Sequence, residues 1–120
     1  MIEDDPVQSH LVCYLLRAFG YDVESAADGV SGLEAAARQR PDLVLCDLGL
    51  PGISGLDVAQ ALRSTEGLSR IPLLAMSAIW SFRSGRERAL ASGFDAYILK
   101  PFTPEGFVAE IETYLPSKLL

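Results

Sequence analysis

Short apolar runs alternate with amphipathic segments along the whole chain. Apolar residues recur at helical spacing in residues 6–19, 30–40, 82–92 and 104–115, and in a segment that follows the turn at 50–55 and ends near 63. Strand-like runs lie at 21–26, 43–46, 71–76 and 96–99, and Met1-Ile2 forms a shortened run before the first helix. Strands that alternate with helices favour a parallel sheet with right-handed crossovers. The pattern therefore predicts a doubly wound α/β fold with five strands and five helices.

Composition narrows the class of protein. A chain of 120 residues with 49% apolar content can form one packed core, and no uncharged apolar run approaches the roughly 20 residues that span a bilayer. The opening Met1-Ile2-Glu3-Asp4-Asp5 lacks the basic start and apolar centre of a signal peptide, so we expect a cytoplasmic domain. The net charge of −6 disfavours direct nucleic-acid binding, because so acidic a domain repels phosphate backbones.

Cysteine and histidine content argues against several kinds of site. Cys13 and Cys46 fit no metal-binding spacing, and a cytosolic cysteine pair is rarely a disulfide. His10 is the single histidine of the chain, which removes zinc sites built on a histidine pair. No Ser-His-Asp arrangement is apparent either.

Polar residues follow four of the strand-like runs. Glu3-Asp4-Asp5 follow the first strand-like run, and Asp47 follows the third, at 43–46. Ser77-Ala78 follow the fourth run, and Lys100-Pro101 follow the fifth. In open parallel sheets, the loops at the carboxyl ends of the strands form the functional crevice. We therefore expect carboxylates, a hydroxyl group and one lysine to meet at one edge.

Three carboxylates at one edge need a cation. Glu3, Asp4 and Asp47 repel one another by about 3 kcal/mol per pair at about 5 Å and an effective dielectric constant near 20. Hard oxygen ligands favour Mg²⁺, with Mn²⁺ as an alternative, and Lys100 would bring the site to neutrality. A metal and a lysine beside a carboxylate suit phosphoryl transfer, with Asp47 as the nucleophile that forms an acyl phosphate.

Each feature taken alone has an ordinary explanation. An acidic pair before a helix usually caps that helix and interacts with its dipole. A lysine before a proline in a turn is usually solvated, and Ser77 alone indicates nothing. The functional interpretation depends on finding all four features at successive strand ends.

Four motifs, in this order and spacing, resemble those of response-regulator receiver domains of two-component signalling over essentially the whole chain. They are Glu3-Asp4-Asp5-Pro6, Asp47-Leu48-Gly49-Leu50-Pro51-Gly52-Ile53-Ser54-Gly55, Ser77-Ala78 and Lys100-Pro101-Phe102. The resemblance implies one receiver domain over residues 1–120, with the flavodoxin-like strand order 2-1-3-4-5.

The resemblance also assigns the phosphoacceptor and the metal ligands by position. Asp47 matches the aspartate that accepts the phosphoryl group. Glu3, Asp4, Asp47 and the backbone carbonyl of Gly49 match the Mg²⁺ site, with Asp4 as a direct ligand and Glu3 acting through water.

The resemblance further implies a switch and its partners. Ser77 matches the hydroxyl residue that binds the phosphoryl group, Lys100 the lysine that pairs with it, and Tyr97 the aromatic switch that turns inward on activation. The phosphodonor would be a histidine kinase or a histidine phosphotransfer protein. A downstream effector would bind the face of the fourth helix, fifth strand and fifth helix, and a phosphorylation-dependent dimer is a further option.

The sequence departs from the family pattern in two places. Only Met1 and Ile2 precede Glu3, where receivers have four or five apolar residues, so we expect the first strand to be truncated. That departure favours numbering that begins inside a longer chain, which would permit a receiver of a hybrid sensor kinase or of another multidomain protein; a stand-alone regulator stays open. Gly49 and Ile79 flank the path of hydrolytic water without a polar side chain, which predicts slow self-dephosphorylation.

Other classes of protein fit less well. A dehalogenase-like phosphatase needs a second aspartate where Gly49 stands, and a flavodoxin-like flavin binder needs a hydroxyl-rich loop after the first strand. A phosphorylation-independent interaction module on the same fold stays open. The chain is in any case no conventional enzyme, since the expected catalysis acts on its own aspartate.

Overall fold

The centre of the fold is a parallel sheet. The computed structural model describes residues 1–50, 52–78, 82–100 and 103–115, and gives only the backbone of residues 78, 82–86, 99 and 100. Within these ranges the strands are β1 (Val44–Asp47), β2 (Leu73–Ala78) and β3 (Ala96–Lys100), in the spatial order β1-β2-β3. All four residues of β1 are buried, as expected for a strand covered on both faces.

The N-terminal residues extend this sheet by single bridges. Ile2 bridges Cys46 on one side and Ala26 on the other, in parallel orientation. The Ile2 amide donates to the Leu45 carbonyl at 2.7 Å, and the Asp47 amide donates to the Ile2 carbonyl at 3.0 Å. Reading across the sheet gives the predicted 2-1-3-4-5 order, but the run at 21–26 pairs only at Ala26. The physical reason is that Met1–Glu3 is too short a partner to hold a longer ladder.

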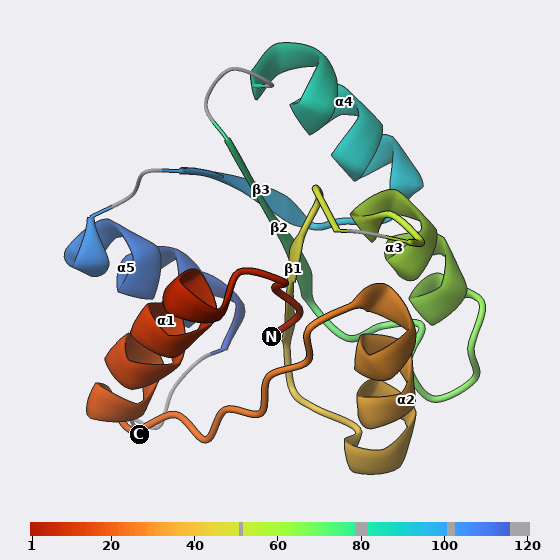
Figure 1. Cartoon of the computed structure of the whole chain (residues 1–120). Coiled ribbons are helices and arrows are strands. Elements are labelled where there is room, and N and C mark those ends of the chain that lie inside the picture. Colours follow the sequence, from red (N-terminus) through yellow and green to blue (C-terminus); the bar gives the residue numbers. More distant parts are fainter. Residues whose placement is uncertain (51, 79–81, 101–102, 116–120) are drawn as a thin grey trace.

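Five helices cover the two faces of the sheet (Figure 1). They are α1 (Pro6–Ala18), α2 (Gly29–Gln39), α3 (Gly55–Arg63), α4 (Phe82–Ser92) and α5 (Pro104–Tyr114). Helices α1 and α5 lie on one face, and α2, α3 and α4 lie on the other. The doubly wound α/β architecture predicted from the sequence is therefore confirmed. The described residues form three strands where five were predicted, and the other two positions in the sheet are single bridges at Ile2 and Ala26. In the described part of the chain, no helix has the length and apolar character that a bilayer crossing requires.

The core is divided by the sheet into two clusters. Alternate residues of a strand point to opposite faces. The cluster under α2, α3 and α4 includes Ile2, Val44, Cys46, Leu73, Ala75 and Tyr97. The cluster under α1 and α5 includes Leu45, Leu74, Met76 and Ile98. Both faces of each strand are thus buried, and the polar residues are confined to the strand ends.

Side-chain caps fix the starts of four helices at the carboxyl edge of the sheet. The capping residues are Asp5 for α1, Asp28 for α2, Ser54 for α3 and Thr103 for α5. Pro6 and Pro104 occupy the first helical positions, where a missing amide hydrogen costs nothing. The caps direct the positive ends of these helix dipoles toward the edge that carries the polar residues.

Arg63 joins the loops at the opposite edge. Its guanidinium group donates to the Asp95 carboxylate at 2.8 Å. It also donates to three backbone carbonyls, those of Gly93 at 2.8 Å, Ser69 at 3.0 Å and Ile71 at 2.7 Å. The Asp95 carboxylate in turn accepts the amide of Leu73 at 2.9 Å, so the same pair holds the first residue of β2.

Candidate functional site

Three carboxylates meet at the carboxyl edge of the sheet. One oxygen each from Glu3, Asp4 and Asp47 lies within 4.8 Å of the other two. Glu3 and Asp47 are buried, with 4% and 9% of their surface exposed, whereas Asp4 is exposed. The cluster therefore has a buried floor and an open side, through which a small ion can enter.

Backbone pairing brings Glu3 and Asp4 to Asp47 across more than 40 residues of sequence. The bridge of Ile2 to Cys46 fixes the chain immediately before the acidic pair. The Glu3 amide donates to the Ala26 carbonyl at 3.0 Å, and a Glu3 carboxylate oxygen accepts the Asp5 amide at 3.2 Å. The sequence places Ile2 in the shortened first strand but does not indicate that it holds the acidic pair in position; an apolar residue directly before an acidic pair is the signal that could have indicated this role.

The loop after β1 folds back on the Asp47 side chain. The Gly49 amide donates to Asp47 Oδ1 at 3.1 Å, a charge-assisted hydrogen bond that orients the carboxylate. The Leu48 amide donates to the Met76 carbonyl of β2 at 3.0 Å. These two bonds hold Gly49, whose carbonyl is the fourth predicted metal ligand, beside the acidic cluster.

The other predicted residues lie on β2 and β3. Asp47 pairs with Met76, so Ser77 is the next residue of β2 along the edge, and it is buried. Tyr97 is buried and pairs with Ala75, on the same sheet face as Ser77. Lys100 ends β3 opposite Ala78, and its side chain is outside the described part of the structure. Residues 51, 79, 101 and 102, which carry the remaining motif positions, also lie outside the described residues.

Cys46 directly precedes Asp47 in β1, and its thiol stays protonated at neutral pH. Its side chain is fully buried, and its Sγ donates to the Asp47 carbonyl at 3.4 Å. Burial raises the pKa of the Cys46 thiol to about 12, and the negative charge of Asp47 acts in the same direction. A thiol that stays protonated is neither a nucleophile nor a metal ligand, so Cys46 contributes packing under Asp47.

The N-terminus of α3 comes unusually close to the backbone of the same loop. A Cβ atom added to Gly55 would lie 2.7 Å from the Asp47 carbonyl oxygen and 2.9 Å from the Leu48 Cα. Gly55 is buried, and its amide is 3.5 Å from the Leu48 carbonyl. The sequence predicts Gly55 only as part of a turn motif, since no sequence pattern reveals such an approach.

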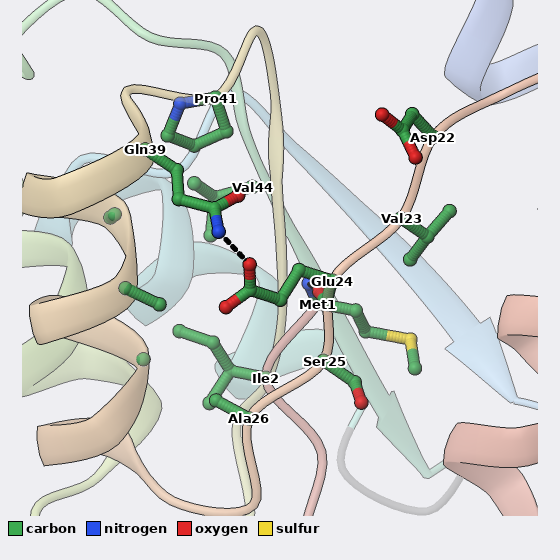
Figure 2. Close-up of a pocket in the computed structure, with 13 residues that line it drawn as sticks. Met1, Ile2, Asp22, Val23, Glu24, Ser25, Ala26, Gln39, Pro41 and Val44 are labelled. Atoms are coloured by element: carbon green, nitrogen blue, oxygen red, sulfur yellow. Dashed lines mark hydrogen bonds between the residues drawn. The ribbon is translucent and has the colours of Figure 1, made fainter.

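A separate cavity lies away from the carboxylates. It has a volume of about 130 Å³ and lies between the N-terminal segment, the 22–26 segment and α2 (Figure 2). The Met1 ammonium group donates to the Glu24 carbonyl at 2.7 Å, and burial lowers the pKa of this amino group. The Glu24 carboxylate already accepts hydrogen bonds from Gln39 and Arg38. The described residues around this cavity therefore pack beside a short strand and form no catalytic or metal-binding arrangement.

The donor set at the carboxyl edge fits a divalent cation. Three carboxylates and a neighbouring backbone carbonyl are hard oxygen ligands, which Mg²⁺ and Mn²⁺ prefer. A parallel three-layer fold with such a cluster at the carboxyl edge defines a receiver of the flavodoxin-like α/β class. The sequence matches the response regulator receiver domain family over residues 1–112. The chain therefore belongs to the response regulator receiver domain family of two-component signalling.

Named relatives agree with this assignment. RpaA of Synechocystis sp., a DNA-binding dual master transcriptional regulator, is 38% identical over 96% of this chain and 47% of its own length. The polar-differentiation response regulator DivK of Brucella anthropi is 35% identical over 96% of this chain and 93% of its own length. The chain thus spans about half of RpaA, about half of the DNA-binding response regulator MtrA of Mycolicibacterium smegmatis, and most of DivK.

A solved structure gives the same result in three dimensions. The receiver domain of the sensor histidine kinase PA1611 from Pseudomonas aeruginosa superimposes with a TM-score of 0.88 and 32% identity, over 97% of this chain and 94% of that chain. In that protein a magnesium ion is coordinated in the active site cleft.

Proposed function

We propose that this domain accepts a phosphoryl group on Asp47, from a phosphohistidine of a histidine kinase or of a histidine phosphotransfer protein in the cytoplasm. The observation that carries the proposal is the cluster of Glu3, Asp4 and Asp47, whose oxygens lie within 4.8 Å of one another. Such a cluster is costly without a cation and suits a reaction that needs one. Membership of the receiver family and the magnesium in the PA1611 receiver support the same reading.

Mg²⁺ would be held by Glu3, Asp4, Asp47 and the Gly49 carbonyl. When bound, the ion supplies positive charge that offsets the carboxylates and polarises the phosphoryl oxygens. An Asp47 carboxylate oxygen then forms a bond to phosphorus while the bond from phosphorus to the donor imidazole breaks. The imidazole keeps the electron pair of that bond and is reprotonated from solvent. The Gly49 amide, bonded to Oδ1, leaves the second oxygen of Asp47 as the nucleophile.

The switch that follows would use Ser77, Lys100 and Tyr97. Phosphorylation adds about −1.5 to −2 charges at Asp47, which attract a hydroxyl donor and an ammonium group. Ser77 stands one residue beyond the β2 residue that pairs with Asp47, so a short movement of that strand end brings its hydroxyl to the phosphoryl group. Tyr97 lies on the same sheet face and would repack into the space that Ser77 leaves.

The face formed by α4, β3 and α5 would then bind a downstream effector, or a second copy in a phosphorylation-dependent dimer. Residues 1–120 would act as one receiver domain, either alone or as part of a hybrid sensor kinase. The alternative is an interaction module on this fold that works without phosphorylation.

Intact mass after incubation with acetyl phosphate and Mg²⁺ tests the proposal. We expect a phosphate-sized gain for the wild type and none for Asp47→Ala. Asp47→Asn is the closest control, because it keeps the shape of the side chain and removes its nucleophilic charge. A folded wild type that binds Mg²⁺ but gains no mass, even with phosphorylated histidine kinases, would favour the interaction module.

Slow self-dephosphorylation is a second expectation, since Gly49 and Ile79 have no polar side chain to orient water. A Cβ atom on Gly49 would meet only Asp47 Oδ1, at 3.9 Å, so a side chain fits there. Gly49→Asn should therefore fold normally and shorten the lifetime of the acyl phosphate, measured by the decay of the mass gain. A wild-type lifetime of seconds would contradict this expectation.

A further inference from the structure

Backbone contacts around Asp47 and Leu48 come from the N-terminal segment, from β2 and from α3. Its amide donates to the Ile2 carbonyl at 3.0 Å. The next residue, Leu48, donates to the Met76 carbonyl of β2 at 3.0 Å. The Asp47 carbonyl oxygen accepts a hydrogen bond from Cys46 Sγ at 3.4 Å and also lies close to Gly55 of α3, where an added Cβ atom would be 2.7 Å away. Only the contact with Gly55 depends on the absence of a side chain.

The close approach of Gly55 cannot be explained by its backbone conformation. Gly20, Gly52, Gly67 and Gly93 have positive φ angles, and Gly55 is not among these glycines. At the first position of a helix with ordinary dihedral angles, alanine is normally as good as glycine or better. Glycine is needed here because the gap between α3 and the Asp47–Leu48 backbone is too narrow for a Cβ atom.

We infer that Gly55 is a positioning residue for the phosphoacceptor, and this inference rests on the proposed function. The N-terminus of α3 sets the depth of the Asp47 backbone, and so the reach of its carboxylate toward Glu3 and Asp4. A Cβ atom 2.7 Å from the Asp47 carbonyl must displace backbone, because neither that oxygen nor the Leu48 Cα at 2.9 Å belongs to a flexible side chain. The displaced loop would carry the Gly49 amide with it.

Gly55→Ala tests the inference, with Gly29→Ala as the matched control. A Cβ atom on Gly29 would lie 2.5 Å from Ile53 Cγ1 and 2.9 Å from Val58 Cγ2, so it meets only side chains and none of the acidic cluster. Both variants introduce one methyl group into a crowded glycine position. Although the contacts of Gly29 reach Val58 of α3, they end on side chains that can shift without moving the backbone, so only Gly55→Ala should affect the site.

Two readouts separate positioning from general destabilisation. In metal-free protein, amide hydrogen exchange of Leu48 should be at least tenfold faster in Gly55→Ala and unchanged in Gly29→Ala. By calorimetry, the Mg²⁺ dissociation constant should rise at least tenfold in Gly55→Ala, against less than twofold in Gly29→Ala. Equal changes in both variants, or no change in Gly55→Ala, would overturn the inference.

A second variant keeps the test sound if Gly55→Ala does not fold. Ser54 caps α3 in a reciprocal capping box with Asp57, and Ser54→Ala loosens the same helix start without adding bulk. It should weaken Mg²⁺ binding about threefold, and Mg²⁺ binding that is unchanged would contradict the role assigned to α3. A wild type that binds no Mg²⁺ would count against the proposed function itself. If the wild type, Gly55→Ala and Ser54→Ala all bind Mg²⁺ equally well, only the role of Gly55 is overturned.

Discussion

Asp4→Asn is expected to stabilise the metal-free protein while removing its response to Mg²⁺. The exposed carboxylate of Asp4 lies within 4.8 Å of carboxylate oxygens of both Glu3 and Asp47, which are buried. Asparagine has nearly the same shape and no charge, so the substitution removes two repulsive pairs and one proposed metal ligand. The two consequences have opposite signs, which makes the prediction specific.

The size of the gain follows from the separation of the charges. Two unit charges at 4.8 Å repel by about 0.9 kcal/mol in water and by about 3.5 kcal/mol at an effective dielectric constant of 20. Because Asp4 faces solvent, the lower limit applies more closely, and two pairs give about 2 kcal/mol. For a domain of this size, that gain raises the melting temperature by about 8 °C.

Thermal and urea unfolding with EDTA, and then with increasing Mg²⁺, measure both effects. Saturation to 100 times the dissociation constant should add about 2.7 kcal/mol to the wild type and almost nothing to Asp4→Asn. Asp5→Asn is the control, because Asp5 caps α1 through the Val7 amide, lies outside the cluster, and asparagine caps a helix equally well. Its stability in EDTA should change by less than about 0.5 kcal/mol.

Two results would refute the prediction for Asp4→Asn. If Asp4→Asn is no more stable than the wild type in EDTA, the three carboxylates do not repel at the distances described. If Mg²⁺ stabilises the variant as much as the wild type, Asp4 is not a ligand. Added monovalent salt should reduce the gain, since salt screens exposed charges.

Two further predictions concern contacts outside the acidic cluster. Arg63→Ala should lower the free energy of unfolding by about 3 kcal/mol, because it removes hydrogen bonds to three carbonyls and to Asp95. Arg63→Lys should recover little of this, since an ammonium group cannot reproduce the guanidinium fork, and a urea titration showing a loss below 1 kcal/mol for Arg63→Ala would refute the estimate. The pKa of Cys46, raised from 9.0 to about 12, makes the unfolded chain lose a proton that the folded chain keeps. The free energy of unfolding should therefore fall as pH rises above 9, with a steeper slope in the wild type than in Cys46→Ala, and equal slopes would contradict the burial of this thiol.

Helix boundaries were predictable because the residues that set them act locally. The caps Asp5 and Thr103, each followed by a proline at the first helical position, need no tertiary information. The predicted bounds of α1, α2 and α5 differ from the observed ones by no more than one residue at each end. The alternation of strands and helices likewise predicted the layers of the fold, since it depends only on hydrophobic period.

Which strands pair, and which distant segments come into close contact, were less predictable from the sequence. The expected strand at 21–26 is a single bridge at Ala26, because its length depends on how much of its neighbour is present to pair with it. The contacts of Arg63 join segments that are distant in sequence, and nothing in the local pattern of α3 indicates them. The proximity of Gly55 to the Asp47 carbonyl is of the same kind, since it is a property of two elements packed together.

The single-residue bridge of Ile2 has a consequence for the order in which the chain folds. Ile2 is synthesised before both of its partners, yet it can pair only when Ala26 and Cys46 are available on either side of it. Contacts of such long sequence separation form late, because the closing of the intervening loops costs chain entropy. The acidic cluster is therefore absent from a nascent chain that has not yet extended past β1. Affinity for a divalent cation would thus distinguish finished molecules from partly folded ones during synthesis.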